Sequence, residues 1–138
     1  MTAQTPDTLQ TTWAPRMLSV LRIVSAVIFF AHGTQKILGF PASEMNPAAF
    51  SLPWIAGMLE LFGGALLIVG FQTRPVAFVL SGLMAVAYWM AHAPRSPFPA
   101  LNGGDAAILY CFVFLYFIFS GPGSWSVDAL LKRKSPAP

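Results

Sequence analysis

The chain has 138 residues, of which 56% are hydrophobic and only 9% are charged, and its formal net charge is +3. Because soluble domains usually carry about 25% charged residues, this composition excludes an ordinary soluble protein and indicates an integral membrane protein. The small positive excess is the usual bias of cytoplasmic membrane flanks, so no nucleic-acid partner is expected. A single cysteine, Cys111, excludes an internal disulfide and a paired-cysteine redox motif.

Four apolar runs follow one another along the chain: Met17–Leu38, Leu52–Phe71, Pro75–Ala91 and Ala106–Ser120. Each approaches the roughly 20 residues that a helix needs to cross a bilayer, although the third and fourth runs are short. The length of the first run, the charge of Arg22 within it and the polar residues before it disfavour a cleaved signal peptide. We therefore expect an all-α fold, an integral membrane four-helix bundle with antiparallel, up-down spans.

Polar tails flank the apolar part of the chain. We expect a polar N-terminal tail at residues 1–15, the four-helix transmembrane domain at 16–128 and a basic C-terminal tail at 129–138. Arg16, Arg74 and the basic run 132–134 fall on one side of a four-span arrangement, and Lys36 and Arg95 fall on the other. This asymmetry predicts cytoplasmic N- and C-termini.

The connection between the second and third runs, Gln72–Pro75, is very short. Short connections join helices that pack side by side in opposite directions. The second and third helices are therefore predicted to be antiparallel neighbours.

Glu60 lies in the middle of the second apolar run, where a charged side chain costs roughly 3 kcal/mol on insertion scales. Gly57, Gly63 and Gly64 stand three or four residues away on the same helical face. Such a face permits close contact with another helix. We expect Glu60 to face the protein interior, where it pairs, takes up a proton or has a function.

Polar residues from all four predicted helices fall in the outer half of the bundle. A rise of 1.5 Å per residue puts His32 and Glu60 at similar depths, roughly 10 and 12 Å below the outer surface, so these two side chains are expected to meet. The candidate ligand-binding residues are His32, Gln35, Lys36, Glu60, Tyr88, His92, Asn102 and Asp105. For the residues nearest the membrane boundary, the alternative to ligand binding is that their side chains snorkel to the surface or cap a helix. Asn102 or Asp105 would then be the N-cap of the fourth helix.

Arg22 stands apart, in the inner half of the first helix. Its long side chain has three partners within reach: Glu60, the lipid head groups and the segment Gly121–Asp128. We treat it as a candidate for a structural ion pair.

Two histidines and two acids raise the question of a metal or haem site, and the spacing argues against both. No His–His or His–Glu pair on one helix has a spacing suited to a metal, so no metal is expected. His32 and His92 differ in predicted depth by about 9 Å, which does not suit axial ligation of one haem.

Six short motifs occur in order along the chain: Leu21–Ile23, His32–Phe40, Leu59–Gly64, Thr73–Arg74, Leu101–Asp105 and Gly121–Asp128. Together they resemble the DoxX family over nearly the whole chain, from Arg16 to Asp128. The family pattern usually has Glu where this chain has Asp105, which keeps the charge and shortens its reach. The resemblance implies a small four-helix protein of the bacterial inner membrane, in a family associated with quinol oxidase and thiosulfate:quinone oxidation.

From this resemblance we expect a subunit or accessory of a membrane redox system, not an enzyme by itself, with a quinone head group in the outer-half site. His32, Lys36 and Tyr88 would donate hydrogen bonds to the quinone, and Glu60 would provide a proton path. The many phenylalanines of the chain offer an apolar slot. The fourth helix carries Phe112, Phe114, Phe117 and Phe119, although such a helix more often faces lipid than a ligand. No nucleotide, flavin or iron–sulfur motif is present, so electrons would come from a partner or from the bound ligand.

Two other functions compete with this hypothesis. One is a structural or assembly subunit of a larger membrane complex, in which the polar residues only fix the bundle. The other is a small proton-coupled carrier, since an intramembrane Glu with a His is a common proton relay. Expected partners are the lipid bilayer and either other membrane subunits or further copies of this chain.

Overall fold

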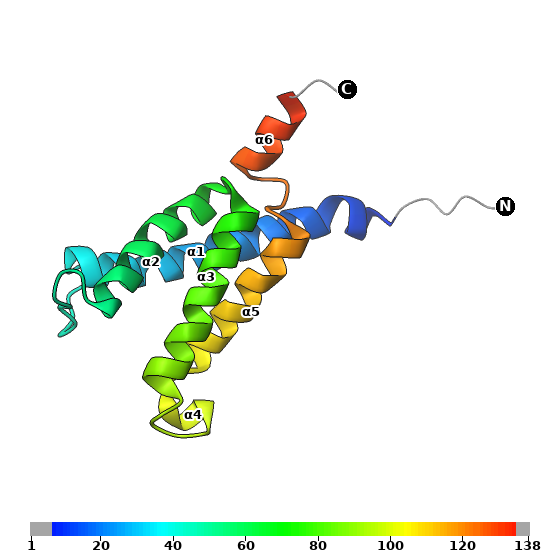
Figure 1. Ribbon diagram of the computed structural model, residues 1–138. Coiled ribbons are helices and arrows are strands. Elements are labelled where there is room, and N and C mark those ends of the chain that lie inside the picture. The colour runs from blue at the N-terminus through cyan, green and yellow to red at the C-terminus, as the bar shows by residue number, and fades with distance from the viewer. Residues whose placement is uncertain (1–6, 135–138) are drawn as a thin grey trace.

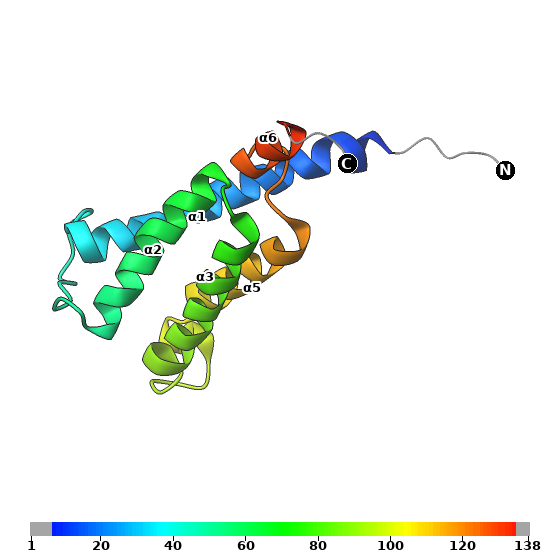
Figure 2. The same ribbon diagram turned by 45° about the horizontal axis from the view of Figure 1, so that its top comes forward.

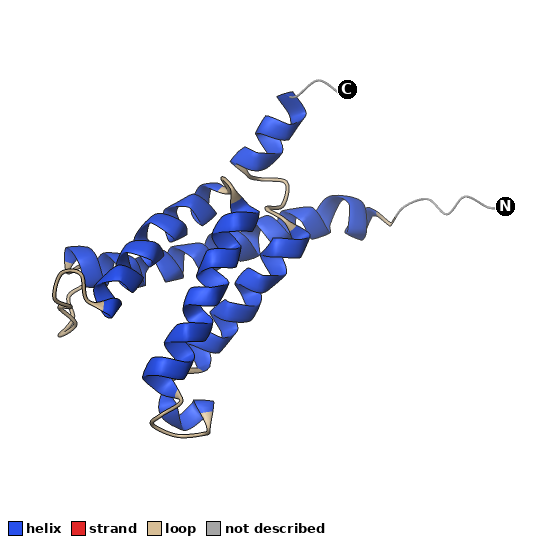
Figure 3. Cartoon of the chain, in the orientation of Figure 1, coloured by secondary structure: helices blue, strands red, loops and turns tan. Residues whose placement is uncertain are grey.

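The computed structural model describes residues 7–134, and every regular element in that part of the chain is a helix (Figure 1, Figure 3). The four apolar helices are α1 (Ala14–Leu38), α2 (Leu52–Val69), α3 (Thr73–Ala87) and α5 (Asp105–Ser120). Two π-helical turns, Leu9–Trp13 and Tyr88–His92, extend α1 at its start and α3 at its end. Two short helices are α4 (Pro99–Asn102) and α6 (Val127–Lys134).

Three of these helices, counted with their π-helical extensions, are long and apolar enough to cross a membrane, and α5 is a shorter apolar helix. The prediction of an all-helical membrane protein is confirmed. Each of the four predicted apolar runs overlaps one of these helices. In the predicted tails, residues 8–15 are helical and residues 129–134 belong to α6, while residues 1–6 and 135–138 lie outside the described part of the chain.

Local sequence explains where α1 and α2 begin and end. Ser51 is the N-cap of α2, and its side chain accepts a hydrogen bond from the Trp54 backbone N–H at 3.4 Å. Pro53, in the first turn, needs no hydrogen-bond acceptor there. The helices α1 and α2 stop at Gly39 and Gly70, whose φ angles of 67° and 69° lie in the left-handed region that glycine adopts without strain.

The apolar helices pack as two hairpins, α1 with α2 and α3 with α5. Figure 1 and Figure 2 show that the hairpins meet at the α2–α3 turn and diverge toward their other ends. We call the end with the α2–α3 turn and residues 121–128 the closed end, and the end with the loops 39–51 and 93–104 the open end. The predicted neighbours α2 and α3 do contact near their turn, where Gly63 lies against Leu80, but they separate beyond it.

The glycines around Glu60 allow the close helix contacts that the sequence predicted. A Cβ atom added to Gly64 would lie 3.0 Å from the Cα atom of Phe30 on α1. One added to Gly57 would lie 2.8 Å from the Cβ atom of Lys36, also on α1. The prediction that this face of α2 is a helix-contact face is therefore confirmed.

Aromatic side chains of α1 and α5 join the two hairpins in the core. Phe29, Phe114 and Phe117 are at most 1% exposed, and the rings of Phe29 and Phe114 meet edge to face at 4.9 Å. Phe112 and Phe119 lie on the outside of α5, with 64% and 74% of their surface exposed. The four phenylalanines of the fourth apolar helix thus divide between the core and the outer surface.

Arg22 ties the closed end together through backbone carbonyl groups. It is 0% exposed. Its guanidinium donates hydrogen bonds to Leu67 and Ile68 at the end of α2 and to Pro122 and Trp125 in the segment before α6. Of the three partners predicted from the sequence, Arg22 contacts the Gly121–Asp128 segment. Among residues 7–134 no carboxylate lies within ion-pair distance of Arg22.

Asp128, the second residue of α6, fixes the start of α3. Its two carboxylate oxygens accept hydrogen bonds from the backbone N–H groups of Gln72 and Thr73, at 2.8 and 2.9 Å. A carboxylate in this position neutralises the positive end of the helix dipole. The turn, α3 and α6 are therefore held in one arrangement at the closed end.

Candidate functional site

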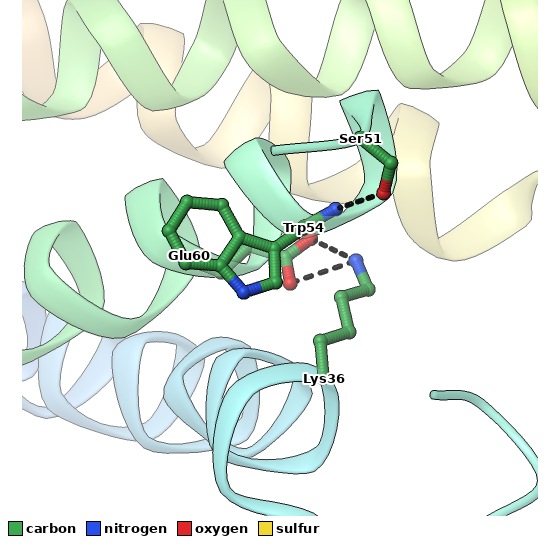
Figure 4. Close-up of polar contacts among 4 residues, drawn as sticks. All are labelled: Lys36, Ser51, Trp54 and Glu60. Atoms are coloured by element: carbon green, nitrogen blue, oxygen red, sulfur yellow. Dashed lines mark hydrogen bonds and ion pairs between the residues drawn. The ribbon is translucent and has the colours of Figure 1, made fainter. Parts of the chain in front are cut away.

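Glu60 is buried and ion-paired with Lys36. The Lys36 Nζ atom lies 2.6 and 2.8 Å from the two carboxylate oxygens of Glu60, and Glu60 is 3% exposed. Figure 4 shows the lysine side chain extending from the last turn of α1 to the carboxylate on α2, the helix that begins with the Ser51 cap and Trp54. Because Gly57 has no side chain, the Lys36 backbone approaches α2 closely enough for this contact.

His32 lies one turn before Lys36 on α1. Its ring meets the ring of Tyr110 on α5 nearly at right angles, with the centroids 6.4 Å apart. His32 and Glu60 line the same cavity, but the hydrogen-bond partner of Glu60 is Lys36. Within residues 7–134 the His32 side chain has no hydrogen bond.

Tyr88, His92 and Asn102 form a second polar group, on the other hairpin. The rings of Tyr88 and His92 stack, with centroids 6.5 Å apart. His92 Nδ1 lies 3.1 Å from the Asn102 carbonyl oxygen, and the buried Asn102 amide donates to the Ser96 carbonyl at 2.8 Å and, at 3.5 Å, to the Tyr88 hydroxyl. These contacts fold the loop between α3 and α5 back onto α3.

Two candidate residues lie outside both groups. Gln35 is half-buried on α1, and no hydrogen bond of its side chain occurs among the described residues. Asp105 is exposed and is the first residue of α5. The N-cap position of α5 is Gly104, not Asn102 or Asp105, and Asn102 accepts a hydrogen bond from the Gly104 backbone N–H at 2.7 Å.

A cavity of about 260 Å³ lies between the hairpins on the side of the open end. Its lining includes four residues with polar side chains, from α1, α2, the end of α3 and α5: His32, Glu60, His92 and Tyr110. Phe29, Met45 and Met84 are among its apolar lining residues. The cavity therefore unites parts of both polar groups, while Gln35, Lys36, Tyr88, Asn102 and Asp105 do not line it.

Tyr110 was missing from the sequence-based candidates. It stands four residues before Phe114, stacks on that ring with centroids 5.6 Å apart, and thus shares the core-facing side of α5. The two alanines at 106 and 107, one turn earlier, leave space beside the tyrosine ring and line the same cavity. Because α5 is apolar on nearly all sides, its sequence pattern gives no signal that singles out this residue.

This lining offers hydrogen-bond donors, acceptors and exchangeable protons beside apolar walls. Ligand sites of this type are mostly apolar, with a few polar groups that fix orientation. A volume near 260 Å³ suits one ring-sized head group better than a whole large ligand. Among the described residues, no three His, Cys, Asp or Glu side chains gather closely enough to hold a metal ion.

Comparisons with known proteins identify the family. The DoxX family model matches residues 17–93, more than half of the chain. An uncharacterized protein of Haemophilus influenzae is 44% identical over 88% of this chain and 96% of its own length. The Escherichia coli inner membrane protein YqjF is 27% identical, covering 83% of this chain and 92% of its own.

A putative oxidoreductase of Bacillus subtilis, CatD, is 26% identical over 80% of this chain and 92% of its own length. No solved structure matches the chain. The family match and the relatives of similar length agree with the apolar helices described above. The chain therefore belongs to the DoxX family and is a multi-pass protein of the bacterial inner membrane.

Proposed function

We propose that this protein is a small subunit or accessory of a membrane redox system and that it binds a quinone head group in the cavity between its hairpins. The observation that carries the proposal is the joint lining of that cavity by His32, Glu60, His92 and Tyr110, from four separate elements. The relative CatD is named a putative oxidoreductase, and this name supports the proposal of a redox role for the present chain.

Quinone chemistry matches what the cavity offers. Reduction of a quinone to a quinol takes up two electrons and two protons, and the carbonyl oxygens of the quinone accept hydrogen bonds. Imidazole and phenol groups of His32, His92 and Tyr110 are suitable donors, and the Glu60 carboxylate is a proton-exchanging group beside them. The electrons would come from a partner oxidoreductase, because the sequence has no motif for a flavin or an iron–sulfur cluster.

The same proposal includes four membrane spans, with α5 as the fourth, and both termini in the cytoplasm. Arg16, Arg74 and the basic residues 132–134 all belong to the closed end, which the excess of positive charge assigns to the cytoplasmic side. The cavity and the Lys36–Glu60 pair then lie in the outer half of the membrane.

The test is equilibrium binding of decylubiquinone to the full-length protein in phosphatidylcholine nanodiscs. Glu60→Gln and His32→Ala are expected to weaken binding about tenfold or more, since the first removes the charged, proton-exchanging carboxylate and the second removes the imidazole from the cavity. Glu44→Gln is the matched control, because Glu44 is an exposed loop carboxylate that does not line the cavity. Equal binding by Glu60→Gln, His32→Ala and the unmodified protein would refute the proposal.

The alternative function, a structural or assembly subunit, has one specific observation in its favour. The Lys36 ammonium already compensates the Glu60 charge, so a buried carboxylate is explained without any ligand. Gentle purification followed by mass spectrometry separates the two functions. If Glu60→Gln releases partner subunits while quinone binding is unchanged, the structural function is correct.

A further inference from the structure

A basic cavity of about 360 Å³ lies at the closed end, away from the cavity between the hairpins. Arg74, at the start of α3, and Lys132, on α6, both line it. Within residues 7–134 neither side chain has a hydrogen bond or an ion pair, and the two cations outnumber the single acid of the lining, Asp128. A second cavity, of about 500 Å³, also includes Arg74 and Lys132 in its lining.

The acid in this cavity, Asp128, already has hydrogen-bond partners within the protein. Both of its oxygens accept hydrogen bonds from the backbone N–H groups of Gln72 and Thr73. Thr73 is fully buried, lines the cavity, and its hydroxyl has no hydrogen-bond partner among the described residues. The cavity thus offers two cations without a hydrogen-bond partner among the described residues, a pair suited to an anionic oxygen group such as a phosphate.

An apolar groove of about 370 Å³ begins where the basic cavity ends. It runs between α2 and α3 and is lined by residues such as Phe62, Leu66 and Val79. Pro75 lines both the groove and the basic cavity, so the two meet at this residue. A charged pocket that continues into an apolar groove on the outside of membrane helices has the shape and polarity of a lipid molecule.

Exposed tryptophans place this cavity at the depth of the lipid head groups. Trp13 and Trp125 are 49% and 53% exposed, and both lie at the closed end. Tryptophan is enriched at the membrane–water interface. Arg16 stacks on the Trp13 ring at 5.4 Å, which adds a third cation at the same level.

We propose that one anionic phospholipid binds here, with its phosphate between Arg74 and Lys132 and an acyl chain in the groove between α2 and α3. This site is independent of the quinone proposal, because it shares no residue with the cavity between the hairpins. The lipid would stabilise the turn between α2 and α3, where the two hairpins are joined.

Native mass spectrometry of the full-length protein, titrated with dioleoyl phosphatidylglycerol or dioleoyl phosphatidylcholine, tests the proposal. Arg74→Gln and Lys132→Gln are each expected to weaken phosphatidylglycerol binding about fivefold, and phosphatidylcholine is expected to bind more weakly than phosphatidylglycerol. Arg133→Gln is the matched control, since Arg133 is the next residue of α6 and does not line the cavity. An equal loss in all three variants would show a general surface charge effect and overturn the proposal.

The groove is tested separately with Val79→Trp, which fills it from a half-exposed position on α3. The expected result is weaker phosphatidylglycerol binding with an unchanged helical circular dichroism spectrum. Glycerol phosphate, added in phosphatidylcholine nanodiscs, tests for a soluble ligand. If glycerol phosphate binds as tightly as the lipid and Val79→Trp has no effect, the cavity is a site for a free phosphate and not for a phospholipid.

Discussion

The closed end and the open end both bury charged side chains, yet the partners of these side chains differ between the two ends. At the closed end, Arg22 donates to four backbone carbonyls and Asp128 accepts from two backbone N–H groups. At the open end, Glu60 has one ionic partner among residues 7–134 and lines a cavity together with two histidines. A buried charged group whose hydrogen bonds are all made to backbone groups holds helices together. A buried charged group that borders a cavity can still form a hydrogen bond with a ligand.

The strongest test of this comparison is Arg22→Met. The substitution leaves the carbonyl groups of α2 and of the segment before α6 without their charged donor. Hydrogen bonds to charged groups are worth about 1.5–3 kcal/mol each, so we expect a loss of more than about 3 kcal/mol even though the bonds are not additive. Unfolding in mixed micelles, followed by circular dichroism, measures it.

Arg16→Met is the control for Arg22→Met on the same helix. Arg16 is half-buried and stacks on Trp13, which predicts a loss below about 1 kcal/mol. Equal losses for the two variants would mean that the carbonyl contacts of Arg22 contribute little. The closed end would then not differ from any other basic membrane flank.

The second test breaks the ion pair at the open end. Lys36→Met strands the buried Glu60 carboxylate, and we expect it to cost about 2 kcal/mol, a value reduced because Lys36 is 17% exposed. Glu60→Gln is expected to cost less, since the freed lysine can turn toward the membrane surface. The double variant Lys36→Met/Glu60→Gln should be more stable than the sum of the two losses predicts.

Unfolding free energies of the four proteins in this cycle measure the coupling between the two side chains. A coupling near zero would contradict a specific Lys36–Glu60 pair. We expect each of these losses of unfolding free energy to be smaller than that of Arg22→Met. The Lys36 and Glu60 variants remove one ion pair, whereas Arg22→Met removes hydrogen bonds to four backbone carbonyl groups.

Sequence alone predicted the apolar helices and the burial of Glu60, since both follow from hydropathy and helical periodicity. From the sequence we expected His32 to meet Glu60, because we calculated the depth of each residue in the membrane from its backbone position. The side chain of Lys36 is long enough to reach back by a full turn, and Gly57 removes the obstacle. The sequence thus grouped Lys36 with Glu60 among the outer-half residues, but backbone depth alone did not show that Lys36, and not His32, is the hydrogen-bond partner.

Two other features were not accessible from the sequence. The helix α5 is apolar on all sides, so nothing in its pattern shows that Tyr110 faces the cavity and Phe112 faces outward. The short α2–α3 connection fixes which helices meet at the turn, but not how far they stay together. The divergence of the hairpins, and with it the cavity, depends on tertiary packing.

The smallest expected effect compares one acid from each end of the molecule. Asp128 caps α3 through two hydrogen bonds, so Asp128→Ala should cost about 1 kcal/mol and speed the amide exchange of Gln72 and Thr73. Within the described part of the chain the Asp105 carboxylate has no hydrogen bond or ion pair, and Gly104 holds the N-cap position, so Asp105 acts through the dipole of α5 and Asp105→Ala should cost a few tenths of a kcal/mol. If the two losses are equal, the backbone contacts of Asp128 add nothing beyond its charge, and saturation by the backbone is not what distinguishes the closed end.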